Sequence, residues 1–502
     1  MKKHILLDIR SLSLPDDKEW LRHLETGAAA GEWLVYLPAG AVAAALYGGD
    51  ETLGLQVRSL LNFCQVIPAR ESSLNHDGDK DRDCGTRLDD AYLQSIPVSG
   101  ADLLITPRPG LHTICPQAVA PAWPLIRQRL DASGTPSPIA FIDLARQQSE
   151  VMVLLEERVH RVLQHGQYIM GPEIVELETL LAAYVGVRHA LTTASGTDSL
   201  EIALRTLDLG PGDEVITVPF TWISTAEVIA AVGARPVFVD IEPAGFNLDV
   251  AQLEAAISPR TKAIMPVSLF GQMPDYAAIN RIAARHGIPV IEDGAQSFGA
   301  TQNGRRSCSV TGIASTSFFP AKPLGCYGDG GALFTQDDAL AAKMRAIRTH
   351  GGEKRHHHPY VGMNGRFDTL QAAVLLAKWP VWENEVAARN RLGARYTELL
   401  RGVCGVPEVM PGNTHVYAQY TIRAADRDAI AVKLKEKGVP TAVYYPKCLH
   451  EQPVFAGLGY GPGSFPESEK AAREVLSLPM HPYLTDETQL FIAQTVRESV
   501  TP

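Results

Sequence analysis

One lysine of this 502-residue chain lies in a sequence context that favours chemistry over solvation. Lys322 follows the aromatic pair Phe318-Phe319 and precedes a glycine-rich loop that ends at Gly331. Glycines let the backbone approach a ligand closely. Lysine is mostly a solvated surface residue, whereas a desolvated lysine can lose its proton and act as a nucleophile or a base. The context therefore favours Lys322 as the reactive amine of a site.

Three further segments carry polar or aromatic residues at predicted strand ends. Asp293 follows a buried strand, Ile288 to Glu292, and a buried carboxylate needs a cationic partner, for which a protonated pyridine nitrogen is suitable. Trp222 can stack on a flat heterocycle, although plain core packing is an alternative. Ser195-Gly196-Thr197 can hold a phosphate at the positive end of a helix dipole, and it can equally be an ordinary helix cap.

Alternating strand and helix patterns begin at Phe141 and must position these residues. Such βα units predict an α/β fold with a largely parallel sheet covered on both faces, and ligands bind outside the carboxyl ends of its strands. We assign a large domain to residues 139–380 and a smaller α+β domain to residues 381–502. A long helix is predicted from Glu383 to Leu400. The predicted strands are Ala190–Ala194, Glu214–Pro219, Pro236–Asp240, Ala263–Leu269, Pro289–Glu292, Tyr417–Ile422 and Thr441–Tyr445.

Residues 1–130 predict a separate α/β domain, and the proline-rich segment 131–138 predicts a linker. The N-terminal domain resembles a PIN-type nuclease, with Asp8 at the end of its first strand. Such nucleases hold divalent metal with about four carboxylates. The segment Thr106-Pro107-Arg108-Pro109, where the last acid is expected, has none. We therefore expect a non-catalytic domain.

Composition narrows the classes of function. A formal net charge of -10 argues against nucleic-acid binding. The seven cysteines form no CxxC pair, which indicates reduced thiols in a cytoplasmic protein. The apolar run from Trp33 to Tyr47 is too short to span a bilayer, so no membrane segment is expected. No metal site is expected either, because the consecutive histidines 356–358 cannot easily converge on one ion.

Together these ordered motifs resemble the DegT/DnrJ/EryC1/StrS family of sugar aminotransferases, over residues 138–500. The resemblance implies the fold of type I transferases that depend on pyridoxal 5′-phosphate (PLP), with a mostly parallel seven-stranded sheet in three layers. The implied cofactor contacts are Lys322 as the Schiff-base lysine, Asp293 on the ring nitrogen, Trp222 stacked on the ring, Gln296 near the ring hydroxyl, and Gly196, Thr197 and Ser317 on the phosphate.

The same resemblance implies a homodimer with shared active sites. In the family, the segment that matches Gly362 to Arg366 reaches into the neighbouring subunit's site, so Asn364 would contact the phosphate and Arg366 the substrate. His358 and Tyr445 are also expected to contact the substrate.

The sequence from Phe319 to Gly331, with His357-His358, looks most like that of enzymes that aminate C3 of a UDP-linked 3-keto-N-acetylhexosaminuronic acid. This resemblance implies L-glutamate as amino donor and a role in surface polysaccharide biosynthesis. Dehydrating relatives have histidine at the position of Lys322. Cys448 stands where the family commonly has a proline, so the resemblance does not define the residues of the sugar pocket. Two alternatives stay open: another nucleotide-sugar C3 or C4 aminotransferase, or a PIN-like nuclease or binding protein with a vestigial PLP domain.

Overall fold

The computed structural model describes residues 3–6, 33–36 and 138–500, and the chain divides into two compact units, residues 1–137 and 138–502. In the first unit, strands β1 (Lys3–Leu6) and β2 (Trp33–Tyr36) pair in parallel. The rest of the predicted PIN-like domain, and the linker up to residue 137, lie outside the described residues.

Seven strands of the second unit form one sheet, in which a four-stranded and a three-stranded part are joined by the bridges Ile264–Val290 and Val267–Asp293. Strand β11 alone runs antiparallel to its neighbours in this sheet. This arrangement confirms the predicted seven-stranded, mostly parallel sheet. The order is β3 (His189–Thr193), β11 (Gly331–Thr335), β10 (Ile313–Ser317), β7 (Ile291–Asp293), β6 (Thr261–Ile264), β4 (Glu214–Thr217) and β5 (Arg235–Phe238).

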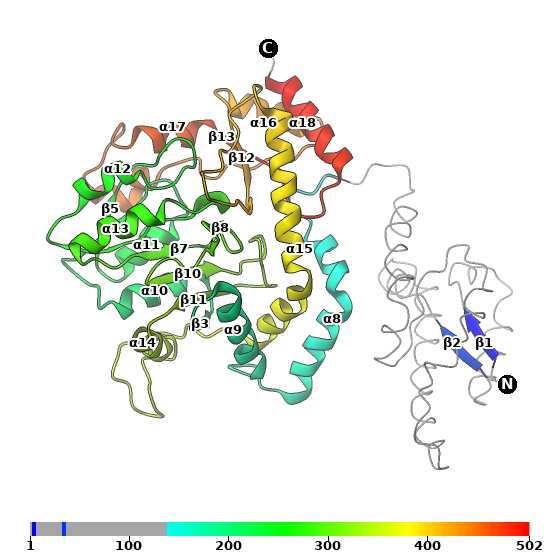
Figure 1. Cartoon of the computed structure of the whole chain (residues 1–502), viewed down its shortest axis with the longest axis horizontal. Coiled ribbons are helices and arrows are strands. Elements are labelled where there is room, and N and C mark those ends of the chain that lie inside the picture. Colours follow the sequence, from blue (N-terminus) through cyan, green and yellow to red (C-terminus); the bar gives the residue numbers. More distant parts are fainter. Residues whose placement is uncertain (1–2, 7–32, 37–137, 501–502) are drawn as a thin grey trace. The chain divides into compact units, whose positions relative to one another are not determined.

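Consecutive strand residues face opposite sides of the sheet, and both sides are buried. On β3, Ala190 packs with the cluster formed by α9 and α15, whereas Leu191 packs with α10, α11 and α14. The three predicted layers are therefore present (Figure 1). The helices are α8 (Leu144–His165), α9 (Pro172–Val185), α10 (Gly196–Thr206), α11 (Ser224–Ala231), α12 (Val250–Leu253), α13 (Tyr276–His286), α14 (Asp338–Arg348) and α15 (Thr369–Leu400).

Helix α15 runs from the sheet to the C-terminal elements (Figure 1). It begins well before the predicted Glu383, because the helix continues through Pro380, so the domain boundary proposed at residue 380 falls inside it. The C-terminal elements are α16 (Arg427–Glu436), α17 (Pro466–Glu474), α18 (Asp486–Val500) and the antiparallel strands β12 (Tyr420–Arg423) and β13 (Val475–Leu478).

The prediction of a strand at Thr441–Tyr445 was wrong. This segment makes one isolated bridge, Ala442 to Ser477, and then leaves the sheet edge. Prolines 440 and 446 flank it and cannot donate to a ladder, and the rings of Tyr444 and Tyr445 pack instead into the core cluster that contains Phe220.

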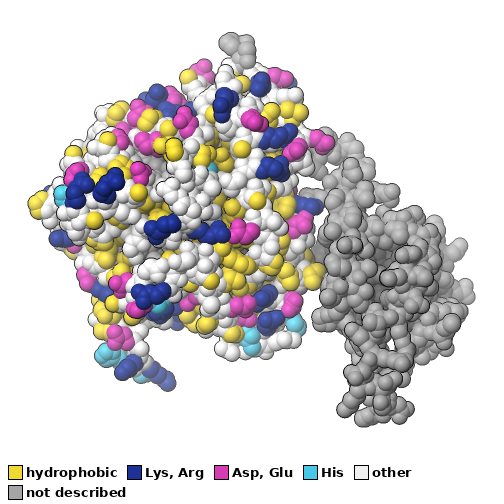
Figure 2. Space-filling model, viewed as in Figure 1, with side chains coloured by type: hydrophobic (Ala, Val, Ile, Leu, Met, Phe, Trp, Pro, Cys, Tyr) yellow, Lys and Arg dark blue, Asp and Glu magenta, His cyan; other side chains and the backbone are white. Residues whose placement is uncertain are grey.

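The surface of residues 138–500 carries interspersed charges. Figure 2 shows acidic and basic side chains side by side on the face that it draws. Among the described helices, none is long and apolar enough to cross a membrane.

Candidate active site

The loop between β10 and β11 carries Lys322. Its backbone N–H donates to the carbonyl of Phe319 at 2.8 Å, and Cys326 N–H donates to Phe318 O at 2.8 Å, which closes the loop. A side chain at Gly325 would meet the carbonyl oxygen of Pro320, so only glycine fits this coil. Burial lowers the pKa of the Lys322 amine, and the nearby Asp293 carboxylate opposes that shift. The loop thus holds an amine that loses its proton more readily than an ordinary lysine does.

Asp293, at the end of β7, is 4% exposed. Its Oδ2 accepts a hydrogen bond from Thr225 Oγ1 at 2.8 Å, and its Oδ1 accepts one from Ala295 N–H at 3.2 Å. Burial raises the pKa of Asp293, while these two donors and the positive charge of Lys322 lower it. Both hydrogen-bond donors are neutral, and a buried carboxylate is stabilised by a cation. The position suits a protonated ring nitrogen.

Gln296 is held at both ends of its amide. Its Oε1 accepts from Phe270 N–H at 2.8 Å, and its Nε2 donates to Tyr445 Oη at 3.0 Å. Trp222 is 58% exposed, and its ring lies 6.1 Å from that of Tyr445. An exposed indole provides an open flat surface on which a ring can stack.

The N-terminus of α10 brings several hydroxyl groups and backbone N–H groups together, and we call it the phosphate corner. Ser195 caps the helix, because its Oγ accepts from Asp198 N–H at 3.0 Å. The hydroxyls of Thr197 and Ser224 lie 2.8 Å apart. A Cβ at Gly196 would come within 2.8 Å of Ser317 Cβ, so the helix start and the end of β10 touch here. Backbone N–H groups and hydroxyls at a helix N-terminus favour an anion.

Two contributors to the site were missed from sequence. Thr225 and Ser224 lie at the start of α11, just after Trp222, and each contacts a predicted site residue, Asp293 and Thr197 respectively. The available signal was the number of hydroxyl residues between Thr221 and Thr225.

Asn364, Arg366 and His358, which were predicted to contact phosphate or substrate, lie on a different segment from Lys322 and Asp293. Asn364 and His358 are exposed, Arg366 Nε donates to Asn364 Oδ1 at 2.8 Å, and the His358 Nδ1 lies 2.9 Å from His350 O. A backbone hydrogen bond from Ala194 N–H to Gly365 O at 3.0 Å ties this segment to the chain just before the start of α10.

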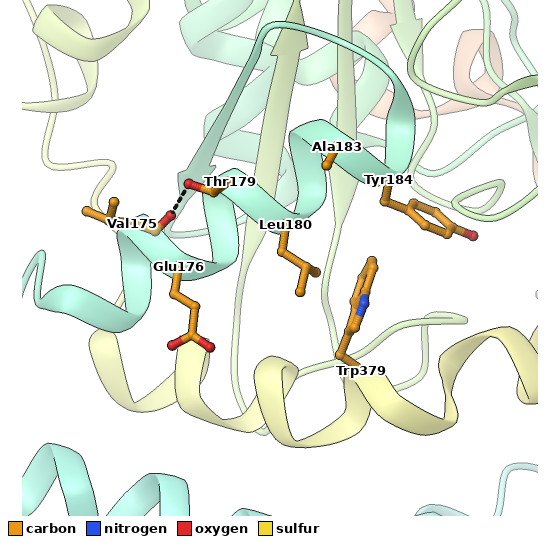
Figure 3. A pocket seen from close by; sticks show the side chains of 7 residues that line it. All are labelled: Val175, Glu176, Thr179, Leu180, Ala183, Tyr184 and Trp379. Carbon is orange, nitrogen blue, oxygen red and sulfur yellow. Dashed lines mark hydrogen bonds between the residues drawn. The ribbon is translucent and has the colours of Figure 1, made fainter.

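The apolar groove of about 630 Å³ lies elsewhere, between α9 and Trp379 of α15 (Figure 3). None of the predicted site residues lines it. Within the described residues no group of three or more histidine, cysteine or acidic side chains is arranged to hold a metal ion.

A model of the DegT/DnrJ/EryC1/StrS aminotransferase family matches residues 153–497. The chain belongs to this family. Among its relatives, the UDP-2-acetamido-2-deoxy-3-oxo-D-glucuronate aminotransferase of Pseudomonas aeruginosa is 54% identical over 347 residues, which are 69% of this chain and 96% of the relative.

Solved structures agree with this aminotransferase assignment. A family aminotransferase from Brucella abortus has a TM-score of 0.71 at 43% identity, covering 72% of this chain and 100% of that one. NtdA from Bacillus subtilis, crystallised with bound cofactor PMP, has a TM-score of 0.69 at 32% identity. The match covers 74% of this chain and 87% of that one. The family match starts at residue 153, so the first 137 residues lie outside it.

This aminotransferase is PLP-dependent, and its residues fit the cofactor. Among the described residues no cation donates a hydrogen bond to the buried Asp293, burial lowers the pKa of the Lys322 amine, the indole of Trp222 is exposed, and the start of α10 favours an anion. These features match the pyridine nitrogen, the aldehyde carbon, the ring face and the phosphate of PLP in turn.

We expect Thr225→Val to lower kcat about tenfold, because a donor to a charged group is lost. Losing this donor raises the pKa of Asp293 further. The carboxylate then ionises at higher pH, so the acidic limb of the profile of kcat/KM against pH should move to higher pH. Thr225→Ser keeps the hydroxyl, and Thr421→Val removes a buried hydroxyl bonded to Ser477 instead. Identical profiles for the valine and serine variants at 225 would contradict this role.

Proposed function

We propose that this aminotransferase transfers an amino group from L-glutamate to C3 of a UDP-linked 3-keto-N-acetylhexosaminuronic acid, for surface polysaccharide biosynthesis. The observation that carries the proposal is the 54% identity to the Pseudomonas aeruginosa enzyme over 96% of that relative. The retained Lys322 supports transamination rather than dehydration.

In the proposed site, Lys322 and Asp293 do the chemistry. When bound, PLP supplies an electron-accepting ring into which the electron pair of a deprotonated substrate carbon can pass. Asp293, oriented by Thr225 and Ala295, keeps the ring nitrogen protonated. The neutral Lys322 amine removes a proton from the substrate carbon as a general base. The protonated amine then gives that proton up as a general acid, and its lowered pKa favours both tasks.

The other residues bind and orient. Gly196, Thr197 and Ser317 hold the phosphate in this proposal, as does Asn364 from the neighbouring subunit, and Trp222 stacks on the ring. The Gln296 amide, whose oxygen is already bound to Phe270 N–H, presents its NH₂ group toward the ring hydroxyl. Tyr445, His358 and Arg366 contact the sugar.

A substrate screen tests the proposal. UDP- and dTDP-linked keto sugars are incubated with L-glutamate and the protein, and the products are identified by mass spectrometry. We expect amination of the UDP-linked 3-keto-uronic acid. Faster amination of another keto sugar would identify that sugar as the substrate instead, and no amination of any sugar would contradict the proposed function.

The proposed location, the cytoplasm, is consistent with the free thiols of Cys308, Cys326, Cys404 and Cys448.

We also propose a homodimer with shared active sites. Arg366 lies on a different segment from Lys322, and Asn364 beside it is exposed, which suits a role in a neighbouring subunit's site.

Mixing Lys322→Ala protein with Arg366→Ala protein is therefore expected to restore activity, up to about one quarter of wild type, since half of the subunit pairs are mixed and each mixed dimer has one intact site. Each variant measured alone is the control. If native mass spectrometry shows subunit exchange and no activity returns, the shared site is contradicted.

A further inference from the structure

A buried lysine of α15 lies against the loop that carries Lys322. Lys378 is 1% exposed, its Nζ donates to Gly325 O at 2.5 Å, and the same Nζ lies 4.2 Å from the centre of the Tyr327 ring. Burial lowers the pKa of Lys378 to about 8, against the attraction of Glu385 and Cys326. Burying an amine costs free energy that an apolar side chain would avoid. Its contact with Gly325 is therefore the feature to explain.

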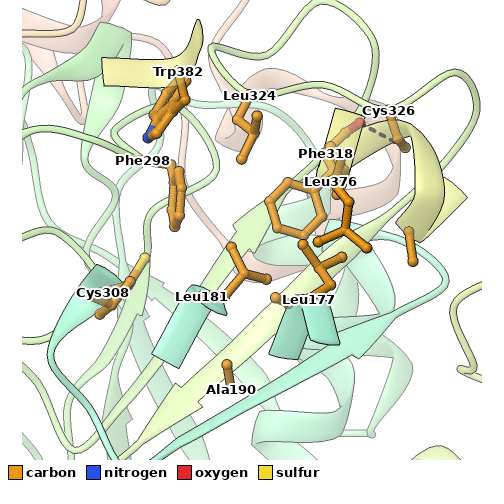
Figure 4. Packing of buried hydrophobic residues seen from close by; sticks show 14 of the residues in the cluster. Leu177, Leu181, Ala190, Phe298, Cys308, Phe318, Leu324, Cys326, Leu376 and Trp382 are labelled. Carbon is orange, nitrogen blue, oxygen red and sulfur yellow. Dashed lines mark hydrogen bonds between the residues drawn. The ribbon is translucent and has the colours of Figure 1, made fainter. Parts of the chain in front are cut away.

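Gly325 lies at the closing end of the Lys322 loop. Cys326 N–H and Cys326 Sγ both bond to Phe318 O, at 2.8 and 3.0 Å, so the segment from Phe318 to Cys326 is a closed loop. Its apolar members Phe318, Leu324 and Cys326 belong to the same core cluster as Leu376 of α15 (Figure 4). The loop is thus anchored on α15 by apolar packing, and Lys378 adds a polar contact to the same helix.

Gln371 makes a second polar contact from the same helix. Its Oε1 accepts from Tyr327 N–H at 2.8 Å, and its Nε2 donates to Tyr327 O at 3.3 Å. Gln371 and Lys378 are seven residues apart in the sequence, which places them on one face of the helix. Two side chains of α15 therefore hold three backbone groups of the segment that follows Lys322.

We propose that Lys378 is a positioning residue for Lys322. By holding the carbonyl of Gly325 against α15, it fixes the closing end of the loop and so the place from which the Lys322 side chain extends. A methionine would fill the same space but would release this carbonyl. The inference rests on the proposed role of Lys322, but its first test needs neither cofactor nor substrate.

Hydrogen exchange of the full-length protein, freed of cofactor, tests the proposal. In Lys378→Met we expect the Lys322 and Cys326 amides to exchange about tenfold faster, with about tenfold weaker PLP binding in a titration, because a hydrogen bond from a charged donor is lost. The melting temperature should change little, because removing a buried charge offsets the loss of the hydrogen bond to the Gly325 carbonyl. Lys433→Met is the control, because Lys433 is an exposed lysine of α16 whose Nζ also donates to a carbonyl, Ser499 O of α18, at 3.0 Å.

Unchanged exchange of these two amides would overturn the proposal. Faster exchange throughout α16 and α18, with a lower melting temperature, would also overturn it, because it would make Lys378 a general stabiliser. If Lys378→Met does not fold, Lys378→Leu is measured in the same way. Normal amination in the substrate screen with unchanged exchange would refute only the role of Lys378, whereas altered exchange without any amination would refute only the proposed function.

Discussion

Lys322→Ala is expected to lower kcat by about four orders of magnitude, because one side chain both binds the cofactor covalently and moves the proton. The variant should also lose the visible absorption band that PLP shows when it is joined to a lysine. Stopped-flow kinetics and absorbance spectra of the purified protein measure the two effects. Both should appear together, since both depend on the same Lys322 amine.

Lys262→Ala is the control for this variant, because Lys262 is an exposed lysine on β6. It should leave the colour and kcat unchanged. A wild-type protein that stays colourless with added PLP, or a Lys322→Ala variant that keeps its visible band, would contradict the assignment.

Predictions at the strand ends were the most successful part of the sequence analysis. Strand β7 ends at Asp293 and α10 begins at Gly196, each one residue from the predicted boundary, whereas β10, which ends at Ser317, was not among the predicted strands. The alternation of apolar strands and helices fixes these ends locally, and parallel strands bring their carboxyl ends to one edge of the sheet. Local sequence therefore predicts where these elements end without any knowledge of distant contacts.

Residues that act through distant contacts were not predicted. Thr225 contacts Asp293 across 68 positions of sequence, and Lys378 contacts Gly325 across 53. The neighbouring sequence of each residue gives no sign of its distant partner. Phe270 has a positive φ of 57°, unusual for a bulky residue, and its N–H fixes the Gln296 amide. That conformation is set by tertiary packing.

Two errors concerned where elements begin and end. The long helix was predicted to start at Glu383, but α15 starts at Thr369 and continues through Pro380, because a long helix with a buried face tolerates one missing hydrogen bond. The strand expected at Thr441–Tyr445 has the apolar, β-branched composition of a strand. Its Tyr445 ring packs toward Phe220 and Trp222, and its Tyr444 ring packs toward Phe141, instead of continuing the sheet. In both cases, tertiary contacts outweighed local propensity.

Asp293→Asn is expected to lower kcat about a thousandfold, equivalent to about 4 kcal/mol of transition-state stabilisation, while PLP binding weakens by no more than about tenfold. The neutral amide cannot keep the ring nitrogen of PLP protonated. The ring would then be a weaker acceptor for the electron pair of the substrate carbon. The phosphate corner at Gly196 and Thr197 is unaffected, so most of the binding contacts stay. Single-turnover kinetics give the rate, and an absorbance titration gives the Kd of PLP.

Glu292→Gln is the matched control, since Glu292 is the neighbouring buried carboxylate on β7. Its oxygens accept from Ser307 Oγ at 2.6 Å and Cys308 N–H at 2.9 Å, away from Thr225. Burial raises the pKa of Glu292 to about 7, so at neutral pH a large share of this side chain is uncharged and the amide resembles it. We expect less than about a tenfold loss of kcat in this control. A near-wild-type rate for Asp293→Asn, or equal losses in the two variants, would show that the charge of Asp293 is not what drives the reaction.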